Sequence, residues 1–424
     1  MARIFVEAYG CSANLADSEM VQGLLARAGH TIIGEPGSAD ASVVLSCTVK
    51  TPTQRKIEKR IRELHLSGRP LVVAGCMPKA QRDLVTDIAP GAILMGPDNI
   101  REVVGVVEAA IKGETLEALE GGSPDRTCLP RIRENPLIHI APIASGCLGS
   151  CTYCIVKRAR GGLTSFHADA IIEDARAALE SGCREIWVTA EDTAAYGWDG
   201  VGLPGLLEGL SDLPGRYFIR VGMMTPNQAM SILDPLIEVY RSDRVFKFVH
   251  IPVQSGSDEV LRRMGRRYTV DDYRRLVAMF RDEIPLLSVS TDIICGFPGE
   301  TEDQFEESLR LVEKTRPDAL NISRFWPRPG TEAASMEGQL HGRITKERSR
   351  RLTGLWRDLS LEGNLRWVGW EGEALVDEAG RSGGMVARNM AYKPIVIRDP
   401  VRVGDFVEVR VTEAMRGYPI GETA

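Results

Sequence analysis

Three cysteines stand close together in the segment SGCLGSCTYC, with a C-x3-C-x2-C spacing: Cys147, Cys151 and Cys154. This spacing allows three thiolates to bind one metal ion or one small metal cluster. No His or Cys follows nearby to complete a tetrahedral zinc site. A four-iron cluster held by three cysteines leaves one iron open for a small molecule. The pattern therefore favours an iron–sulfur cluster over zinc and over three unrelated core cysteines.

Three further cysteines are far apart in the sequence, yet each closes a strand-like run. Cys11 follows RIFVEAYG, Cys47 follows ASVVLS, and Cys76 follows PLVVAG. The carboxyl ends of parallel strands lie along one edge of a sheet, so the three thiols meet there if the strands are near neighbours. The alternative is three independent buried cysteines. The remaining three match no ligand pattern: Cys128, Cys183 and Cys295.

Length and composition predict a multidomain globular protein of the cytoplasm. The chain has 424 residues, which suggests two to four domains, and 43% hydrophobic and 26% charged residues are ordinary values. An odd number of cysteines, nine, argues against a disulfide framework. There is no run of 18 apolar residues and no secretory pattern, so no membrane partner is predicted. The net charge of −6 argues against a uniformly basic surface.

The order of strand-like and helix-like runs divides the chain into two α/β units followed by one β unit. Residues 1–112 alternate between the two and predict a parallel α/β domain. Residues 113–134 are rich in Gly, Pro and charge and are interpreted as a linker. Residues 135–360 contain six strand-like runs, which predict an open, partial (β/α)6 barrel rather than a complete one. Residues 361–424 contain short strands separated by Gly and Pro, which predict a small β-barrel.

The C-x3-C-x2-C loop after the first strand of a partial barrel resembles the signature of radical S-adenosylmethionine (SAM) enzymes. The resemblance implies that the open iron binds the amino and carboxylate groups of SAM. Electron transfer from the cluster then yields a 5′-deoxyadenosyl radical, which abstracts hydrogen from unreactive carbon. The hard chemistry belongs to the cofactor, and the protein positions it.

The segments YGCSAN, SCTVKTP and VAGCMP resemble the cysteine motifs of the methylthiotransferase family. These enzymes join such an N-terminal domain to a radical SAM core and a C-terminal RNA-binding TRAM barrel. The resemblance implies two [4Fe-4S] clusters, with Cys11, Cys47 and Cys76 holding the sulfur-donating one. The C-x3-C-x2-C cysteines then hold the radical-generating one. One departure is Leu45-Ser46 where the family usually has Asn-Thr, which leaves Cys47 unaffected.

Polar residues gather at the predicted carboxyl ends of the barrel strands, where they are placed to hold SAM. The backbone of Tyr153 is expected near the adenine, by resemblance to similar enzymes. The alternative is that each polar residue caps a helix or forms a surface salt bridge. The other predicted SAM-binding residues are Glu191, Asp192, Gln254, Ser255, Asp292 and Arg324.

Three branches of the methylthiotransferase family differ in substrate. One modifies N6-isopentenyladenosine in tRNA, one an aspartate of a ribosomal protein, and one C2 of N6-threonylcarbamoyladenosine at position 37 of tRNA. SCTVKTP, GCLGSCTYCIVKRARGGLTSF and TAEDTAAYGWDGVGLPGLL are most similar to the third, archaeal and eukaryotic branch. That chemistry implies a tRNA substrate, an electron donor and a sulfur source, and the sequence identifies neither of the last two.

Basic segments mark where RNA is expected to bind, although a solvated charged face is the alternative. Residues 344–360 form one, and two more lie beside the cysteine loop: Lys157, Arg158 and Arg160, and Arg262, Arg263, Arg266 and Arg267. From residue 361 onward eight Lys or Arg stand against ten Asp or Glu, so the last domain needs a local patch. The candidates are Arg381, Arg388, Lys393 and Arg398.

The last domain has more acidic than basic residues, which leaves open the branch that modifies a ribosomal-protein aspartate. Two hypotheses from other classes also remain: a non-catalytic RNA-binding iron–sulfur protein or sensor, and a zinc-binding module.

Overall fold

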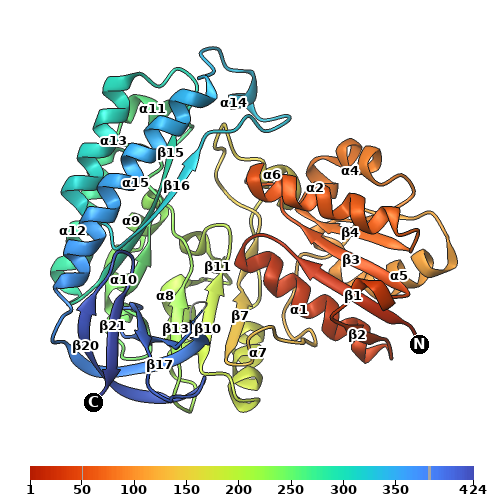
Figure 1. Cartoon of the computed structure of the whole chain (residues 1–424), viewed down its shortest axis with the longest axis horizontal. Coiled ribbons are helices and arrows are strands. Elements are labelled where there is room, and N and C mark those ends of the chain that lie inside the picture. Colours follow the sequence, from red (N-terminus) through yellow and green to blue (C-terminus); the bar gives the residue numbers. More distant parts are fainter. Residues whose placement is uncertain (50, 381–382) are drawn as a thin grey trace.

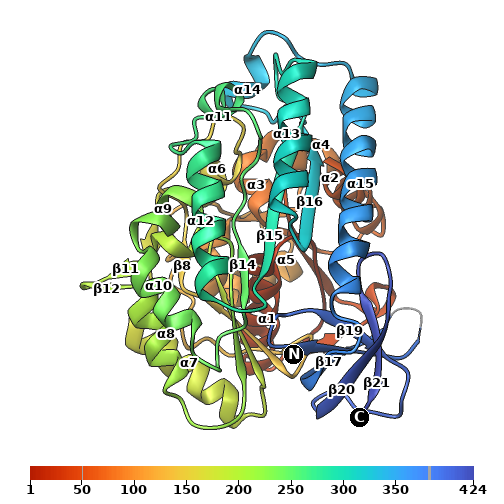
Figure 2. The ribbon, with the colours of Figure 1, turned by 90° about the vertical axis from the view of Figure 1, so that its left-hand side faces the viewer.

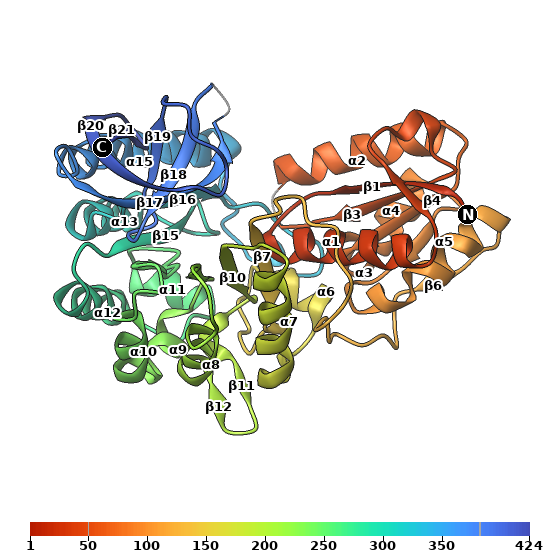
Figure 3. The same ribbon diagram turned by 90° about the horizontal axis from the view of Figure 1, so that it is seen from below.

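The computed structural model of the chain describes residues 1–49, 51–380 and 383–424. Figure 1 shows an N-terminal α/β domain, a central barrel of strands and helices, and a C-terminal β-barrel. Seen from below in Figure 3, the N-terminal domain lies to the right of the central unit, and the C-terminal barrel lies at the upper left. No described helix is long and apolar enough to cross a membrane.

The N-terminal domain is a six-stranded parallel sheet with the strand order β2-β1-β3-β4-β5-β6. Val43 and Leu45 of β3 pack with the helices of one face, and Val44 packs with those of the other. Because both faces are covered, β3 and β4 are buried throughout, as their unbroken apolar runs indicate. The strands are β1 (Arg3–Ala8), β2 (Thr31–Ile33), β3 (Ala41–Ser46), β4 (Leu71–Gly75), β5 (Ile93–Met95) and β6 (Glu117–Ala118). The helices are α1 (Ser12–Arg27), α2 (Thr51–Leu66), α3 (Cys76–Ala80), α4 (Arg82–Ile88) and α5 (Val103–Lys112).

The central unit contains six parallel strands in two groups of three, β13-β10-β7 and β14-β15-β16. Parallel bridges such as Met223↔His250 join the groups into one open, partial barrel. The strands are β7 (Ile138–Pro142), β10 (Glu185–Thr189), β13 (Phe218–Val221), β14 (Phe248–His250), β15 (Ser288–Cys295) and β16 (Ala319–Arg324). They coincide with the six predicted runs.

Helices cover the outside of the central barrel. Two of them, α12 and α13, begin at capping boxes, in which Thr269 pairs with Asp272 and Thr301 with Gln304. Their apolar faces pack onto the largest core cluster of the molecule. The helices are α7 (Ala168–Glu180), α8 (Leu203–Ser211), α9 (Pro226–Ser231), α10 (Leu233–Tyr240), α11 (Asp258–Arg263), α12 (Val270–Glu283), α13 (Glu302–Thr315) and α15 (Gly342–Leu365). The short α14 spans Glu332–Ser335.

The C-terminal unit is a closed five-stranded barrel with the order β17-β18-β19-β21-β20. Phe218, Phe246 and Phe248 of the central unit pack with its Leu375. These aromatic residues lie where β13 and β14 begin, so the C-terminal barrel covers the end opposite the cysteine loop, as Figure 2 shows. The strands are β17 (Glu371–Ala379), β18 (Met385–Asn389), β19 (Pro394–Ile397), β20 (Phe406–Ala414) and β21 (Pro419–Thr423). The predicted fold class, three units of these kinds, is confirmed.

The segment predicted as a linker is packed against the N-terminal domain. It adds β6 to the sheet edge, and its Arg126 is only 2% exposed. Further along, the backbone of Pro130 and Arg131 crosses helix α1 directly over Gly23. A Cβ atom at Gly23 would lie 2.2 Å from the Pro130 carbonyl oxygen and 2.5 Å from the Arg131 nitrogen. This close approach fixes the path by which the chain leaves the first domain.

Substituting Gly23→Ala is therefore expected to destabilise the protein by about 1–3 kcal/mol, because rigid backbone occupies the space of the new methyl group. Gly105 is a matched control, since it is also helical and has open space around it. There Ala is expected to stabilise by about 0.5–1 kcal/mol through helix propensity. Urea unfolding of both variants measures the difference, and equal midpoints would contradict the close approach.

Candidate functional site

The loop that carries Cys147, Cys151 and Cys154, here called the loop triad, is pinned at both ends by a short strand pair. β8 (Ala144–Ser145) pairs antiparallel with β9 (Thr164–Ser165), and α6 (Val156–Arg160) lies between them. Gly146 has φ of 78°, and a Cβ atom there would lie 2.0 Å from the Gly162 carbonyl oxygen. The tight entrance to the loop thus requires glycine.

Two thiols of the loop triad, those of Cys147 and Cys151, lie close to Gly149 and line one small recess. The Gly149 N–H donates to Cys147 Sγ at 3.2 Å, and a Cβ at Gly149 would lie 3.3 Å from Cys147 Sγ and 3.6 Å from Cys151 Sγ. Burial raises the pKa of Cys147 and of Cys154. A bound metal would offset this by favouring the thiolates. Backbone N–H groups aimed at sulfur are typical of iron–sulfur sites.

Cys11, Cys47 and Cys76, the sheet triad, follow three adjacent strands. Their strands β1, β3 and β4 are hydrogen-bonded neighbours, which is the condition that the sequence argument required. Gly10 has φ of 123°, and a Cβ there would lie 3.0 Å from Cys47 Sγ. Burial raises the pKa of Cys76 to about 12, with Arg160 opposing and the other two thiols adding to the effect. The three thiols therefore lie within electrostatic reach of one another at one sheet edge.

Neither triad has the geometry of a single-ion site. Across residues 1–49, 51–380 and 383–424, no three His, Cys, Asp or Glu side chains converge closely enough to hold one metal ion. A zinc site requires ligands at about 2.0–2.3 Å from one centre. A four-iron cluster is larger than a single ion and is held by cysteine thiolates, which is the donor type that each triad offers.

A buried charge network, here called the interface network, joins the two triads. Arg160 donates to Asp17 Oδ2 at 2.8 Å and to Asn14 Oδ1 at 3.1 Å, and its Nε lies 3.2 Å from Glu191 Oε1. Arg126 donates to the other Asp17 oxygen at 2.7 Å. Burial alone would lower the pKa of Arg160, but Asp17, Cys76 and Glu191 raise it well above its ordinary value. Side chains from α1, the linker, α6 and the end of β10 are thereby bound together.

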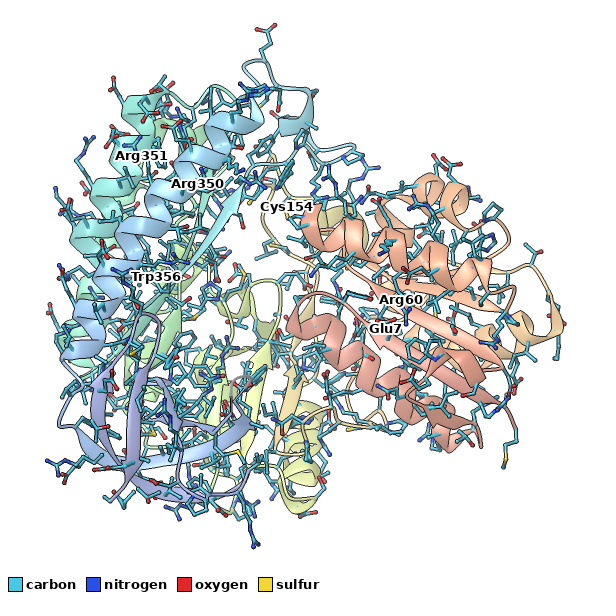
Figure 4. All side chains as sticks on the ribbon, viewed as in Figure 1. Glu7, Arg60, Cys154, Arg350, Arg351 and Trp356 are labelled. Carbon is cyan, nitrogen blue, oxygen red and sulfur yellow. The ribbon has the colours of Figure 1, made fainter. Side chains whose placement is uncertain are left out.

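The helices beside the triads also pack directly. Cys76 and Ala80 of α3 form one buried cluster with Ile155 and Ala159, which precede and belong to α6. Cys154 is the residue immediately before Ile155. The two triads are therefore neighbours across the boundary between the first two units, and Figure 4 shows Cys154 at that boundary.

A cavity of about 490 Å³, the central cavity, opens between the N-terminal domain, the cysteine loop, the strand ends and helix α15. The N-terminal domain contributes Val49 and Pro52, and α15 contributes Ser349 and Thr353. The other lining residues are Tyr153–Val156, Gln254, Asp292, Ile294 and Asn321–Trp326, with Arg328. This volume is in the range of sites for drug-sized ligands.

Four predicted SAM-binding residues line the central cavity: Tyr153, Gln254, Asp292 and Arg324. The Tyr153 hydroxyl accepts from Arg266. Asp292 accepts from Asn321 Nδ2 at 2.7 Å and lies 2.9 Å from His250 Nε2, so these side chains join β14, β15 and β16. The Arg324 guanidinium stacks 4.8 Å from the Trp326 ring centre.

The other three predicted residues lie elsewhere. Asp192 lines a smaller recess of about 50 Å³ with Cys147 and Cys151, and it accepts from the Thr225 N–H at 3.0 Å. Glu191 is in the interface network, away from the cavity lining. Ser255 is fully buried and accepts from the Ser257 N–H at 3.2 Å within its own turn, so it does not line the cavity either.

Sequence reasoning missed the residues that connect units, because their signal is three-dimensional. Arg328 is 5% exposed and donates to Val49 O at 2.6 Å and to Gln54 Oε1 at 2.5 Å, both in the N-terminal domain. Asn321 and Trp326 also line the central cavity. No spacing pattern marks any of these three residues.

The basic residues beside the cysteine loop make contacts within the protein. Arg160 is buried in ion pairs, so the expectation that it meets phosphate is wrong. Lys157 and Arg158 donate to backbone carbonyls of Gly149 and Gly330. Arg266 is engaged with Tyr153.

In the C-terminal barrel, Lys393 pairs with Asp318, and Arg388 pairs with Asp377. Lys393 is also buried, so the RNA contact expected of it is wrong, whereas the contact expected of Arg388 stays a prediction. Arg398 is exposed, and Arg381 lies outside the described residues.

Comparisons with family models divide the chain in the same way as the fold. The model described as "Uncharacterized protein family UPF0004" matches residues 3–96, the Radical SAM superfamily matches residues 142–312, and the TRAM domain matches residues 366–423. The partial barrel and its cysteine loop thus belong to a radical SAM protein, which confirms the predicted cofactors, SAM and iron–sulfur clusters.

Curated relatives cover the whole chain. A probable threonylcarbamoyladenosine tRNA methylthiotransferase of Pyrococcus horikoshii is 42% identical over 100% of this chain and 99% of its own length. The threonylcarbamoyladenosine tRNA methylthiotransferase of Homo sapiens is 38% identical over 99% of this chain and 74% of its own length. The chain belongs to the threonylcarbamoyladenosine tRNA methylthiotransferase family, as its cysteine motifs predicted.

Solved structures share the fold at low sequence identity. The radical SAM methyltransferase TsrM from Kitasatospora setae has a TM-score of 0.58 at 15% identity, covering 79% of this chain and 77% of its own. The radical SAM enzyme OxsB has a TM-score of 0.54 at 12% identity, covering 84% and 55%. These similarities support the fold alone.

Replacing Asp17 by Asn tests the interface network. The substitution leaves Arg126 and Arg160 without the carboxylate that they share, so a loss of about 3–5 kcal/mol in unfolding free energy is expected. Asp40→Asn is the control, since Asp40 pairs with Arg3 at the exposed surface and little change is expected. Thermal unfolding compares them. Two equally small effects would mean that the network does not hold the units together.

Proposed function

We propose that this protein transfers a methylthio group to C2 of N6-threonylcarbamoyladenosine at position 37 of tRNA. The observation that carries the proposal is the meeting of two cysteine triads, from separate units, beside one cavity of about 490 Å³. Relatives at 38–42% identity over nearly the whole chain bear the corresponding name. The reaction also needs an electron donor and a source of sulfur.

Each triad is proposed to hold one [4Fe-4S] cluster. The loop triad would hold the cluster that binds SAM, and the sheet triad would hold the cluster at which sulfur is methylated. Bound there, the cofactors would supply the radical that removes hydrogen from C2 and the methylthio group that replaces it. The protein holds the two sites together through the interface network, and Cys154 of the loop triad lines the central cavity.

The polar residues at the strand ends are proposed to orient SAM. Asp292, Gln254 and Arg324 present hydrogen-bonding groups to the central cavity, and Tyr153 forms part of its wall. Asp192 faces the recess beside the loop triad. Glu191 and Ser255 are proposed to act by positioning, through Arg160 and through the turn after Gln254.

Helix α15 offers the best surface for tRNA. Arg343, Lys346, Arg350 and Arg357 repeat at helical spacing on one exposed side, and no described ion pair involves them. The side chains of this basic stripe border Ser349 and Thr353, which line the central cavity.

On the other side of α15, Arg348 and Arg351 pair with Glu300, Glu302 and Glu306. Figure 4 shows Arg351 on the side of α13 and Arg350 on the side nearer Cys154. A helix of 24 residues spans about 36 Å, so the stripe reaches from the cavity toward the C-terminal barrel.

Anaerobic reconstitution followed by turnover tests the function. With reductant, SAM, a sulfide source and tRNA bearing threonylcarbamoyladenosine, mass spectrometry of nucleosides is expected to show the 2-methylthio product together with 5′-deoxyadenosine. A protein with Cys147, Cys151 and Cys154 all changed to Ser is expected to lose about half of its iron and all 5′-deoxyadenosine. The matching triple variant at Cys11, Cys47 and Cys76 should keep 5′-deoxyadenosine formation but lose the product.

Three other outcomes would replace the proposal. Product only from isopentenyladenosine, or only from a ribosomal-protein aspartate, would assign the chain to another branch. Absence of 5′-deoxyadenosine from a fully reduced protein would favour an RNA-binding sensor. A colourless protein containing zinc would favour a zinc module.

The basic stripe predicts a salt-dependent contribution to tRNA affinity. Changing Arg343, Lys346, Arg350 and Arg357 to Gln removes up to four phosphate contacts, which lowers the slope of log affinity against log salt by about 0.7–0.9 per contact. Filter binding at several salt concentrations measures it. Arg310→Gln is the matched control. It removes one exposed charge that lies on α13, outside the basic stripe, and it should leave the slope unchanged. Equal slopes for the parent and the stripe variant would place tRNA elsewhere.

A further inference from the structure

The central cavity is lined by more guanidinium groups than carboxylates. Two guanidinium groups line it, those of Arg324 and Arg328, together with one carboxylate, that of Asp292. Asp292 is engaged with His250 and Asn321. None of the ion pairs among the described residues includes Arg324 or Arg328. A ligand with an anionic group would therefore improve the charge balance of this cavity.

Of the two guanidinium groups, that of Arg328 has the greater need of an anionic partner, because Arg328 is only 5% exposed. A guanidinium has five N–H donors. Those of Arg328 are given to two neutral acceptors, Gln54 Oε1 at 2.5 Å and Val49 O at 2.6 Å. The Cys47 thiol and the Glu58 carboxylate are the acidic groups that face it, and Glu58 forms no described ion pair with it. Donors remain for a planar, two-oxygen partner, which is the geometry that guanidinium groups bind best.

The position of Arg328 separates it from the expected place of the cofactor. It reaches from the segment after β16 into the N-terminal domain, beside Cys47 of the sheet triad. Tyr153 and Cys154 form the part of the same wall that belongs to the loop triad, where SAM is proposed to bind. An anion at Arg328 therefore belongs to the molecule that receives sulfur.

We propose that Arg328 binds the carboxylate of the threonylcarbamoyl group on the substrate adenosine. This rests on the proposed function, since N6-threonylcarbamoyladenosine carries that carboxylate and adenosine does not. An isopentenyl group is apolar and would leave the buried guanidinium unneutralised. A site built for a charged hydrogen-bonding group strongly rejects an analogue that lacks it. Arg328 thus selects the substrate branch, and Gln54 holds its side chain in place.

Equilibrium binding to two anticodon stem-loops tests the proposal. One carries threonylcarbamoyladenosine, and the other carries the same group with its carboxylate converted to the neutral amide. The reconstituted parent protein is expected to prefer the carboxylate form by about 10- to 100-fold. In Arg328→Gln this preference should fall to about 1, while the Kd for SAM stays within about twofold of the parent value.

Two further variants separate binding from structural roles. Arg324→Gln removes the other cavity cation, and it is expected to weaken SAM binding while keeping the preference for the carboxylate. Gln54→Ala removes a protein partner of Arg328 but keeps its charge, so the preference should persist even if thermal stability falls. If Gln54→Ala loses the preference to the same extent as Arg328→Gln, then Arg328 only connects the two units and does not bind the carboxylate.

The opposite results would overturn the proposal. An unchanged preference in Arg328→Gln, or a loss of SAM affinity in place of the preference, would assign the guanidinium to another partner. If the parent converts both stem-loops to methylthio products with equal kcat/KM, the proposed function stands and this subsite fails. If neither is converted but the carboxylate form binds better, the subsite stands and the proposed function fails.

Discussion

The structure depends on one buried interaction, the sharing of the Asp17 carboxylate by Arg126 and Arg160. Asp17 lies on the first helix of the N-terminal domain, Arg126 on the connecting segment, and Arg160 on the helix that ends the cysteine loop. All three are at most 5% exposed, so each charge relies on the others. Glu191 extends the set to the end of β10. Ions taken out of water to this extent specify one relative placement of the two units.

That placement turns two separate cysteine motifs into one site. Arg160 stands between the triads, near enough to Cys76 to oppose the effect of burial on its pKa, while Ile155 and Ala159 pack against Cys76 itself. The cavity is then lined by the N-terminal domain and the central unit, including α15, whose exposed basic side chains extend toward the C-terminal barrel. The N-terminal domain, the cysteine loop and α15 thereby form parts of one continuous wall around the cavity.

The sequence was sufficient for the fold class and for the positions of the six cysteines at strand ends, since hydrophobic runs and Gly-rich ends are local signals. It also predicted Gln254, Asp292 and Arg324 at the cavity, because carboxyl ends of parallel strands meet. Contacts between units could not be predicted this way. The basic run after the cysteine loop suggested phosphate binding by Arg160, which is instead buried by a carboxylate 143 positions away. Similarly, Lys393 was a candidate for RNA binding, and it is instead buried in an ion pair with Asp318.

The central claim is that the two triads hold clusters close together across the interface network. Electron paramagnetic resonance of the reduced, fully reconstituted protein tests it most directly. The account predicts that the two paramagnetic centres broaden and relax one another, and that this effect disappears when either triad is changed to Ser. A spectrum equal to the sum of those of the two single-triad variants, with unchanged relaxation, would contradict it.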